Sequence, residues 1–283
     1  MSIHKEIKRI TTHTLQEMKD RGEKIAMLTS YDFSMATIVD DAGIDVILVG
    51  DSASNVMAGH ETTLPITLDQ MIYHASSVVR AIERCLVVVD LPFGSYQGNS
   101  KNALDSAIRI MKESGGHAVK LEGGSEISES ITRILTAGIP VMGHLGLLPQ
   151  TAEKYSVQAK KSEDAINLIQ DAKILEESGA FSIVLEMVTS DVTEIITKSV
   201  KVPTIGIGSG INCDGQVLVV HDMLGMFEKI KPKFAKRYLN LSEEIRNAVN
   251  SYVNDVKEKR FPEKEHTFSM EKDELEKLEK KIV

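Results

Sequence analysis

The sequence contains little cysteine, and this scarcity excludes two kinds of site. Only Cys85 and Cys213 occur in 283 residues, far apart and outside any Cys-x-x-Cys pattern. A disulfide scaffold would need several paired cysteines, and a thiolate zinc site would need closely spaced ones. We therefore expect neither feature. We also expect the chain to be located in a reducing compartment, the cytoplasm.

Basic clusters and long apolar runs are also missing. The net charge is -8, and no Lys/Arg-rich run offers the positive surface that nucleic acids require. No segment approaches the roughly 18 consecutive apolar residues of a membrane span. Residues 1–10 are mildly basic but lack the apolar core and small-residue cleavage site of a targeting peptide. The sequence thus predicts no nucleic-acid partner and no membrane segment.

What the chain does contain is a series of short, β-branched runs that stop at Gly, Pro or Asp. Each is apolar throughout rather than alternating, which is typical of a parallel strand covered on both faces. The eight runs are Ile25–Leu28, Val46–Val49, Leu86–Val89, Ala118–Leu121, Ile139–Met142, Ser182–Leu185, Pro203–Ile207 and Val217–Val220.

Segments with helical spacing lie between these runs, for example 103–110 and 165–175, and several end in a Gly. Eight strands alternating with helices predict an α/β fold, the (β/α)8 TIM barrel, which routinely fills about 250 residues as one domain. A doubly wound open sheet has the same alternation, but the third glycine of its dinucleotide fingerprint would fall at Ile211. The length and the eight units favour the closed barrel, with residues 1–283 as a single domain.

Two helical additions are expected to flank the barrel. Residues 1–23 read as a leading helix over the N-terminal end of the barrel, and helical segments follow from about residue 228. The last stretch, 270–283, is a charged helical tail with Leu275, Leu278 and Ile282 on one face. Such a tail is either a solvated helix or a small contact in an oligomer.

Acidic residues follow three consecutive predicted strands. Asp51, Asp90 and Glu122 each end an apolar run, and in a barrel the C-terminal ends of the strands meet at one rim, where active sites lie. A single such carboxylate is weak evidence, since loops need polar residues. Three together repel one another unless a cation or protons neutralise them. Oxygen ligands favour a hard cation, Mg²⁺ above all.

Other polar residues reach the same rim. Lys120 lies two residues before Glu122 in a strand, so both side chains point to one face, and Lys120 is either a structural ion pair or an anion-binding group. Glu186 ends the sixth run, across the barrel from the carboxylates, and is either a general base or a loop residue paired with a lysine. His144, after the fifth run, is more often a hydrogen-bonding residue than a catalyst.

Several motifs, in this order along the chain, resemble ketopantoate hydroxymethyltransferases. The resemblance runs from about residue 11 to 268. It rests on the segments 49–52 (VGDS), 59–65 (GHETTLP), 90–93 (DLPF), 119–124 (VKLEGG), 143–147 (GHLGL), 206–210 (GIGSG), 214–216 (DGQ), 221–222 (HD), 232–235 (PKFA), 261–262 (FP) and 265–268 (EHTF).

The resemblance implies a Mg²⁺ site at Asp51, Asp90 and Glu122, keto-acid contacts from Asp51, Ser52, Asp90 and Lys120, and Glu186 as catalytic base. The implied reaction transfers the methylene group of 5,10-methylenetetrahydrofolate to 3-methyl-2-oxobutanoate. The product is 2-dehydropantoate, a precursor of pantothenate and coenzyme A. Family members are typically cytoplasmic homo-oligomers, decamers in bacteria.

The chain departs from the family pattern at three places. Ala53-Ser54 stands where the family has Leu-Gly, and residues 153–160 stand where it has a longer, glycine-rich stretch. We expect this second segment to lie near the folate, so the change bears on folate affinity and lid motion. The charged extension after Phe268 continues beyond the usual end of the family.

Two other functions compete with this interpretation. One is a Mg²⁺-dependent, enolate-forming barrel enzyme of the phosphoenolpyruvate mutase and isocitrate lyase kind. Such enzymes commonly carry a catalytic cysteine loop, whereas Gly123-Gly124 here leads into Ser125 without a cysteine. The other is a barrel that binds a keto acid without catalysis.

Overall fold

The computed structural model describes residues 8–228 and 232–282, so the first part of the expected N-terminal lead lies outside the described residues. Eight parallel strands form a closed barrel in chain order, and β8 bonds to β1. The strands are β1 (Ile25–Thr29), β2 (Val46–Val49), β3 (Leu86–Asp90), β4 (Ala118–Glu122), β5 (Val141–Gly146), β6 (Ser182–Glu186), β7 (Thr204–Ile207) and β8 (Gly215–Leu218). The predicted (β/α)8 TIM barrel is thereby confirmed.

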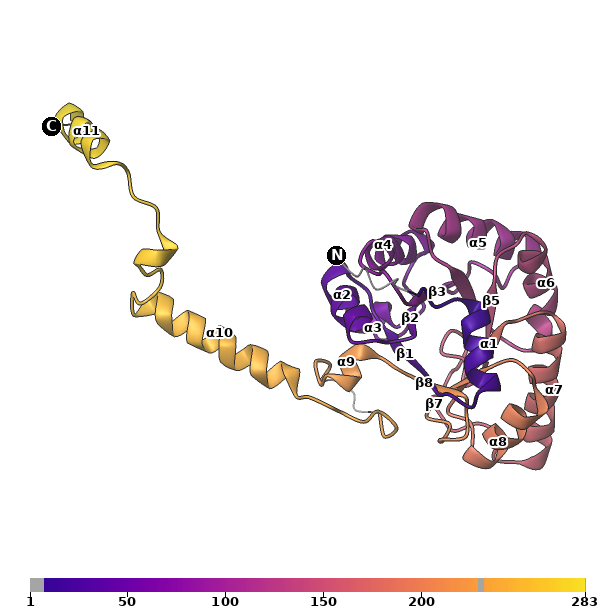
Figure 1. The fold of residues 1–283 in the computed structure, drawn as a ribbon. Coiled ribbons are helices and arrows are strands. Elements are labelled where there is room, and N and C mark those ends of the chain that lie inside the picture. The colour runs from indigo at the N-terminus through magenta and orange to yellow at the C-terminus, as the bar shows by residue number, and fades with distance from the viewer. Residues whose placement is uncertain (1–7, 229–231, 283) are drawn as a thin grey trace, which may run out of the picture.

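Helices surround this barrel on the outside (Figure 1). They are α2 (Phe33–Asp41), α3 (Ala53–Val56), α4 (Leu68–Val79), α5 (Ser100–Ser114), α6 (Ser128–Thr136), α7 (Ser162–Glu177) and α8 (Ser190–Ser199). In α5 the Asn99 carboxamide accepts from the N–H of Asn102 at the start of the helix, and Gly115 ends the helix in the left-handed region. Only a short loop, without a helix, joins β7 to β8.

Apolar residues fill the barrel at its N-terminal end. One buried cluster joins the outer strand faces to the helices, and a second lies inside the barrel. Leu15 and Met18 of α1 (Thr12–Asp20) belong to the inner cluster, where they pack with Ile25 and Met27. As predicted, this leading helix closes the N-terminal end.

Three strands begin at positions other than predicted, and for β7 the difference is one residue, Thr204 in place of Pro203. β5 starts at Val141, after Pro140, which has no N–H for a strand ladder, and it runs on to Gly146. His144 therefore lies within the strand and not after it. β8 starts at Gly215, where an added Cβ would lie 2.6 Å from the carbonyl oxygen of Ile25, so only glycine permits this close pairing.

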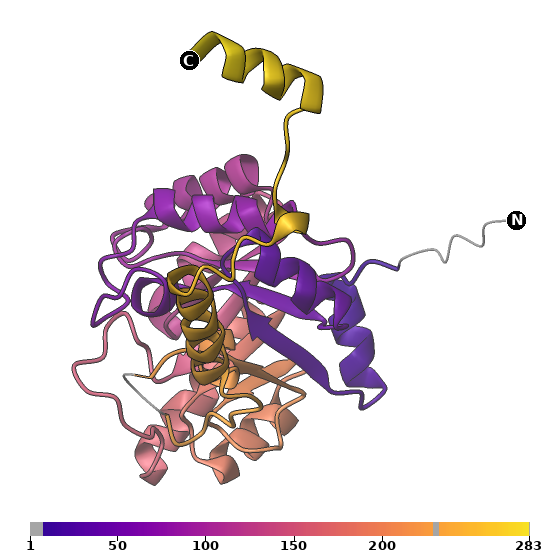
Figure 2. The same cartoon turned by 90° about the vertical axis from the view of Figure 1, so that its left-hand side faces the viewer.

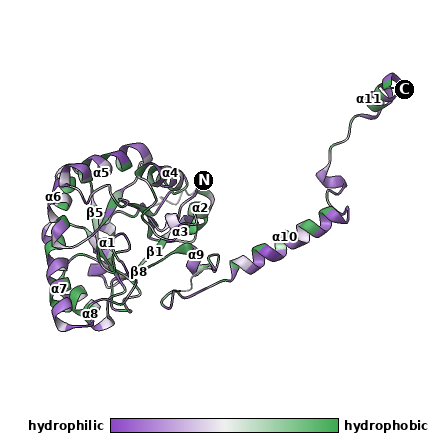
Figure 3. Cartoon of the chain, turned by 180° about the vertical axis from the view of Figure 1, so that it is seen from behind, coloured by the Kyte–Doolittle hydropathy of each residue, from purple (hydrophilic) through white to green (hydrophobic). Residues whose placement is uncertain are grey.

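The C-terminal segment leaves the barrel. The short helix α9 (Val220–Met223) follows β8, and then α10 (Leu241–Lys257) and α11 (Lys272–Ile282) point away into solvent (Figures 1 and 2). Neither α10 nor α11 has a buried residue. Hydrophobic and hydrophilic residues alternate along α10 (Figure 3). Among the described residues, no helix has the length and apolar character needed to cross a membrane.

Candidate active site

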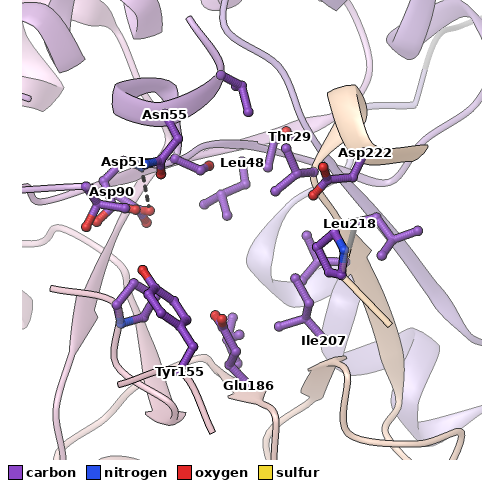
Figure 4. A pocket seen from close by; sticks show the side chains of 18 of the residues that line it. Thr29, Leu48, Asp51, Asn55, Asp90, Tyr155, Glu186, Ile207, Leu218 and Asp222 are labelled. Carbon is purple, nitrogen blue, oxygen red and sulfur yellow. Dashed lines mark hydrogen bonds between the residues drawn. The ribbon is translucent and has the colours of Figure 1, made fainter. Parts of the chain in front are cut away.

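A cavity of about 770 Å³ opens at the C-terminal ends of the strands. It brings together the predicted site residues, which all line it: Asp51, Ser52, Asp90, Lys120, Glu122, His144 and Glu186. In Figure 4, Asp51 and Asp90 lie on one wall, while Glu186 and Tyr155 project from another. The convergence expected from strand order is therefore observed in the structure.

Two aspartates and a lysine form the first wall. The backbone N–H of Asp51 donates to Asp90 Oδ2 over 3.0 Å, and Lys120 Nζ lies 3.1 Å from Asp90 Oδ1. All three residues are buried. Lys120 has reached the cavity because it shares a strand face with Glu122, as the spacing predicted. Next to them, Ser52 Oγ lies 2.8 Å from the hydroxyl of buried Tyr31.

Charge is concentrated in this wall. Burial, followed by the neighbouring Asp90 and Glu122, raises the pKa of Asp51 to about 8. Burial also raises the pKa of Asp90, although Lys120 opposes it. Lys120 has a raised pKa because the carboxylates outweigh its own burial. The negative charge of the carboxylates is therefore greater than Lys120 alone can neutralise, and an additional cation would be stabilised here.

His144 connects this wall to Glu186. Its Nδ1 lies 3.0 Å from Lys120 Nζ and 3.5 Å from Glu122 Oε1, and its Nε2 lies 3.3 Å from Glu186 Oε2. Burial and Lys120 lower the pKa of His144, but the two glutamates outweigh them and raise it to about 9. The position of Glu186 in the sequence had suggested that it stands apart from the other carboxylates. In the structure it is connected to them through His144, which β5 places between the two glutamates.

Backbone strain occurs directly beside Glu186. Met187 has a φ of 48°, in the left-handed region that residues other than glycine rarely adopt. Its N–H donates to Ile207 O, and its carbonyl accepts from Gln158 N. These bonds from the neighbouring segments hold the chain in this conformation. Such strain is often found where a functional side chain must be aimed.

Gln150 and Tyr96 were missed in the sequence. The buried Gln150 amide donates to Asp51 Oδ2 over 2.9 Å, and its backbone N–H donates to Glu122 Oε2 over 3.1 Å. Tyr96 donates its hydroxyl to Gln150 Oε1 over 2.9 Å. Neither residue ends a strand, so strand ends gave no signal for them. The Pro149-Gln150 pair after the GHLGL segment is the one local indication.

The carboxylates of Asp51, Asp90 and Glu122 are chemically suitable ligands for a hard cation, although their oxygens are not arranged in a coordination geometry. In residues 8–228 and 232–282 no group of three His, Cys, Asp or Glu side chains is arranged to hold a metal. Yet Asp90 Oδ1 and Glu122 Oε1 are buried without a hydrogen bond, even though Lys120 lies close to Asp90 Oδ1. Unsatisfied buried oxygens among carboxylates are what a Mg²⁺ ion would use.

Residues 153–160 and 53–54 take up defined positions beside the cavity. Tyr155 is half-exposed and lines the cavity, and Ala159 has a φ of 55°. Buried Ser54 donates its hydroxyl to Thr62 O over 2.7 Å, which ties the loop carrying His60 to α3. These two departures from the family pattern thus lie around the cavity mouth and do not alter the carboxylate wall.

Comparison with solved structures supports the barrel fold. A phosphoenolpyruvate phosphomutase from Streptomyces platensis superimposes with a TM-score of 0.61 at 14% identity, over 96% of this chain and 99% of that one. A phosphonopyruvate hydrolase superimposes with a TM-score of 0.58 at 13% identity, over 96% and 95%. At such identities the likeness concerns the fold alone.

Sequence comparison is much more specific. The model of the family described as ketopantoate hydroxymethyltransferase matches residues 9–264. The 3-methyl-2-oxobutanoate hydroxymethyltransferase of Cytophaga hutchinsonii is 66% identical over 91% of this chain and 96% of its own length. That of Salinibacter ruber is 57% identical over 92% and 99%. The chain belongs to the ketopantoate hydroxymethyltransferase family.

Proposed function

We propose that this chain transfers the methylene group of 5,10-methylenetetrahydrofolate to 3-methyl-2-oxobutanoate. With one water molecule, the products are 2-dehydropantoate and tetrahydrofolate, at the entry to pantothenate and coenzyme A synthesis. The main observation behind the proposal is that the carboxylates and Lys120 lie on one wall of the cavity and Glu186 projects from another. High identity to hydroxymethyltransferases, rather than to the mutase and lyase group, supports this reaction over its first rival.

Asp51, Asp90 and Glu122 would hold the Mg²⁺ ion. All three are buried acidic side chains, and two of them carry oxygens without a hydrogen bond. When bound, the ion polarises the ketone of the substrate and stabilises negative charge that develops on its oxygen.

Lys120 and Ser52 would bind the keto acid beside that site. The Lys120 ammonium is buried and lines the cavity, so a substrate carboxylate can pair with it away from water. The Ser52 hydroxyl adds a hydrogen-bond donor, oriented by Tyr31. Asp51 and Asp90 complete this side of the pocket. Together they would fix the substrate with its C3 hydrogen facing the opposite wall.

Glu186 would remove the C3 proton. Its side chain is largely buried but open to the cavity, which leaves one carboxylate oxygen free to approach the substrate while Oε2 contacts His144. The enolate carbon would then form a bond to the methylene carbon of the folate, whose bonds to N5 and N10 break. The two nitrogens take up the proton from C3 and one proton from water, and the remaining hydroxide becomes the hydroxyl of the product. His144 would orient Glu186 for this step.

The outer part of the cavity would bind the folate. Tyr155, Met187, Phe227 and Phe234 line it and offer apolar and aromatic surface suited to a pterin ring. The cavity is far larger than a small keto acid requires, which supports a second, larger substrate. Residues 153–160, the departure noted in the sequence, lie at this outer part through Tyr155.

The chain would act as a single-domain protomer of a cytoplasmic homo-oligomer, a decamer as in bacterial family members. Support comes from α10, which exposes an apolar face and has no buried residue. Its Ile245, Val249, Tyr252 and Val256 are each more than two-fifths exposed and recur at helical spacing. An exposed stripe of this kind is typical of a helix that packs against another subunit.

Deuterium exchange at C3 of 3-methyl-2-oxobutanoate, followed by proton NMR, tests the proposal. We expect exchange that depends on Mg²⁺ but not on folate, is lost in Glu186→Gln and persists in Glu177→Gln, an exposed control. Adding methylenetetrahydrofolate should then yield 2-dehydropantoate. Saturable keto-acid binding without exchange or product would instead support a barrel that binds without catalysis.

A further inference from the structure

The Gln150 side chain uses its whole hydrogen-bonding capacity within the cluster. Nε2 donates to Asp51 Oδ2 over 2.9 Å and to Leu91 O over 3.0 Å. Oε1 accepts from the Tyr96 hydroxyl and from Gln97 Nε2, each over 2.9 Å. Turning the amide over would set its oxygen against two acceptors, so its orientation is fixed.

Gln150 also takes part in a regular pattern among the three carboxylates. Each of them has one oxygen bonded to a neutral N–H. Gln150 Nε2 donates to Asp51, Gln150 N donates to Glu122, and Asp51 N donates to Asp90. The second oxygens of Asp90 and Glu122 have no hydrogen bond. A single residue thus holds one oxygen of Asp51 and one oxygen of Glu122, and the other oxygen of Glu122 is left without a hydrogen bond.

This pattern matters because Mg²⁺ and Ca²⁺ use carboxylates differently. Mg²⁺ requires near-octahedral geometry at about 2.0–2.1 Å and takes one oxygen from a carboxylate. Ca²⁺ accepts six to eight oxygens at about 2.3–2.6 Å and often takes both oxygens of one carboxylate. A carboxylate with one oxygen held by a buried N–H can serve Mg²⁺ fully, but it can bind Ca²⁺ through both oxygens only after that hydrogen bond breaks.

We propose that Gln150 is a positioning residue that makes the site select Mg²⁺ over Ca²⁺. It limits Asp51 and Glu122 to one metal-facing oxygen each, without contacting the ion itself. The inference rests on the metal site of the proposed function. It goes beyond that function because it concerns the discrimination between two ions and not the reaction.

The test measures ion binding directly, without turnover. Mn²⁺ bound to the protein loses the sharp EPR signal of the free ion, and competition by Mg²⁺ or Ca²⁺ then gives a dissociation constant for each. Gln150→Met keeps the side-chain length and the backbone N–H to Glu122 but releases Asp51 Oδ2. We expect Mg²⁺ binding to weaken and the ratio of the two dissociation constants to shift toward Ca²⁺ by roughly 10-fold.

A second variant separates selectivity from affinity. Gln150→Glu also loses the donor to Asp51 but adds negative charge, so we expect both ions to bind more tightly while selectivity still shifts toward Ca²⁺. Gln16→Met, in α1 at the opposite end of the barrel, should leave both dissociation constants unchanged. Circular dichroism melting curves confirm that each variant is folded.

The outcomes distinguish this inference from the proposed function. Failure of the wild-type protein to bind Mn²⁺ that Mg²⁺ displaces would remove the metal site and this inference together. Wild-type binding with equal weakening of Mg²⁺ and Ca²⁺ in Gln150→Met would overturn the inference alone, because a merely structural residue affects both ions alike. Unchanged selectivity in folded Gln150→Glu would overturn it as well.

Discussion

His144 Nε2 lies 3.3 Å from Glu186 Oε2, and this contact joins the proposed base to the carboxylate wall. The ring fixes Glu186 from inside the barrel, because β5 places His144 between β4 and β6. We predict that His144→Asn, whose shorter side chain cannot reach Glu186, lowers kcat roughly 10- to 100-fold. KM for the keto acid should change much less.

Steady-state kinetics with saturating folate measure this difference. His13→Asn is the matched control, since His13 is exposed on α1 and does not line the cavity. A large rise in KM with unchanged kcat in His144→Asn would show that His144 binds the substrate and does not orient the base.

Asp40 provides a pH-dependent part of the stability far from the site. Its carboxylate accepts from the backbone N–H groups of Glu83, Arg84 and Cys85. Burial raises the pKa of Asp40, but these donors outweigh burial and hold it below its usual value. We predict that Asp40→Asn lowers the free energy of unfolding by about 1–3 kcal/mol at pH 7, because one donor then faces an NH₂ group.

The sign of the pH effect follows from the lowered pKa. The stabilisation by Asp40 is complete above the unfolded value of about 3.9 and is lost as the pH falls through the folded pKa. Urea unfolding of the wild-type protein and Asp40→Asn should therefore give a difference that is constant near neutral pH and shrinks below about pH 4. Asp41→Asn, next to it and exposed, should show no such trend.

Ala159 stands in the left-handed region, with a φ of 55°, which glycine adopts at much lower cost. An alanine at positive φ destabilises the folded chain relative to glycine. We therefore predict that Ala159→Gly raises the free energy of unfolding by about 1 kcal/mol, whereas Ala152→Gly, at an ordinary φ, lowers it by about 0.4–1 kcal/mol. Urea unfolding at pH 7 measures both, and equal signs would contradict the prediction.

The exposed face of α10 should control assembly. A charge at its centre, Val249→Glu, is expected to break subunit contacts, because an unpaired charge is costly in an apolar interface. Light scattering after gel filtration should then show a mass near the 31.2 kDa of one chain in place of an oligomer. Asn247→Glu, on the opposite face of the helix, should keep the oligomer intact.

The sequence predicted the barrel and the side chains at its strand ends because both follow from local patterns. Apolar runs that end in Asp51, Asp90 and Glu122 specify where strands stop, and parallel strands bring those ends together. Gln150 and the contact of His144 with Glu186 could not be predicted in this way. They depend on the path of a loop and on strand register, which are set by Pro140 and by contacts distant in sequence.

Both thiols lie under the protein surface, and this has a practical use. Cys85 and Cys213 are buried, and burial raises the pKa of Cys213 to about 11 and that of Cys85 further still. Almost no thiolate is present at neutral pH, so maleimide dyes should leave the native chain unlabelled. A cysteine introduced on α10 would then carry a fluorophore at one defined position, and energy transfer between labelled subunits could follow their exchange in real time.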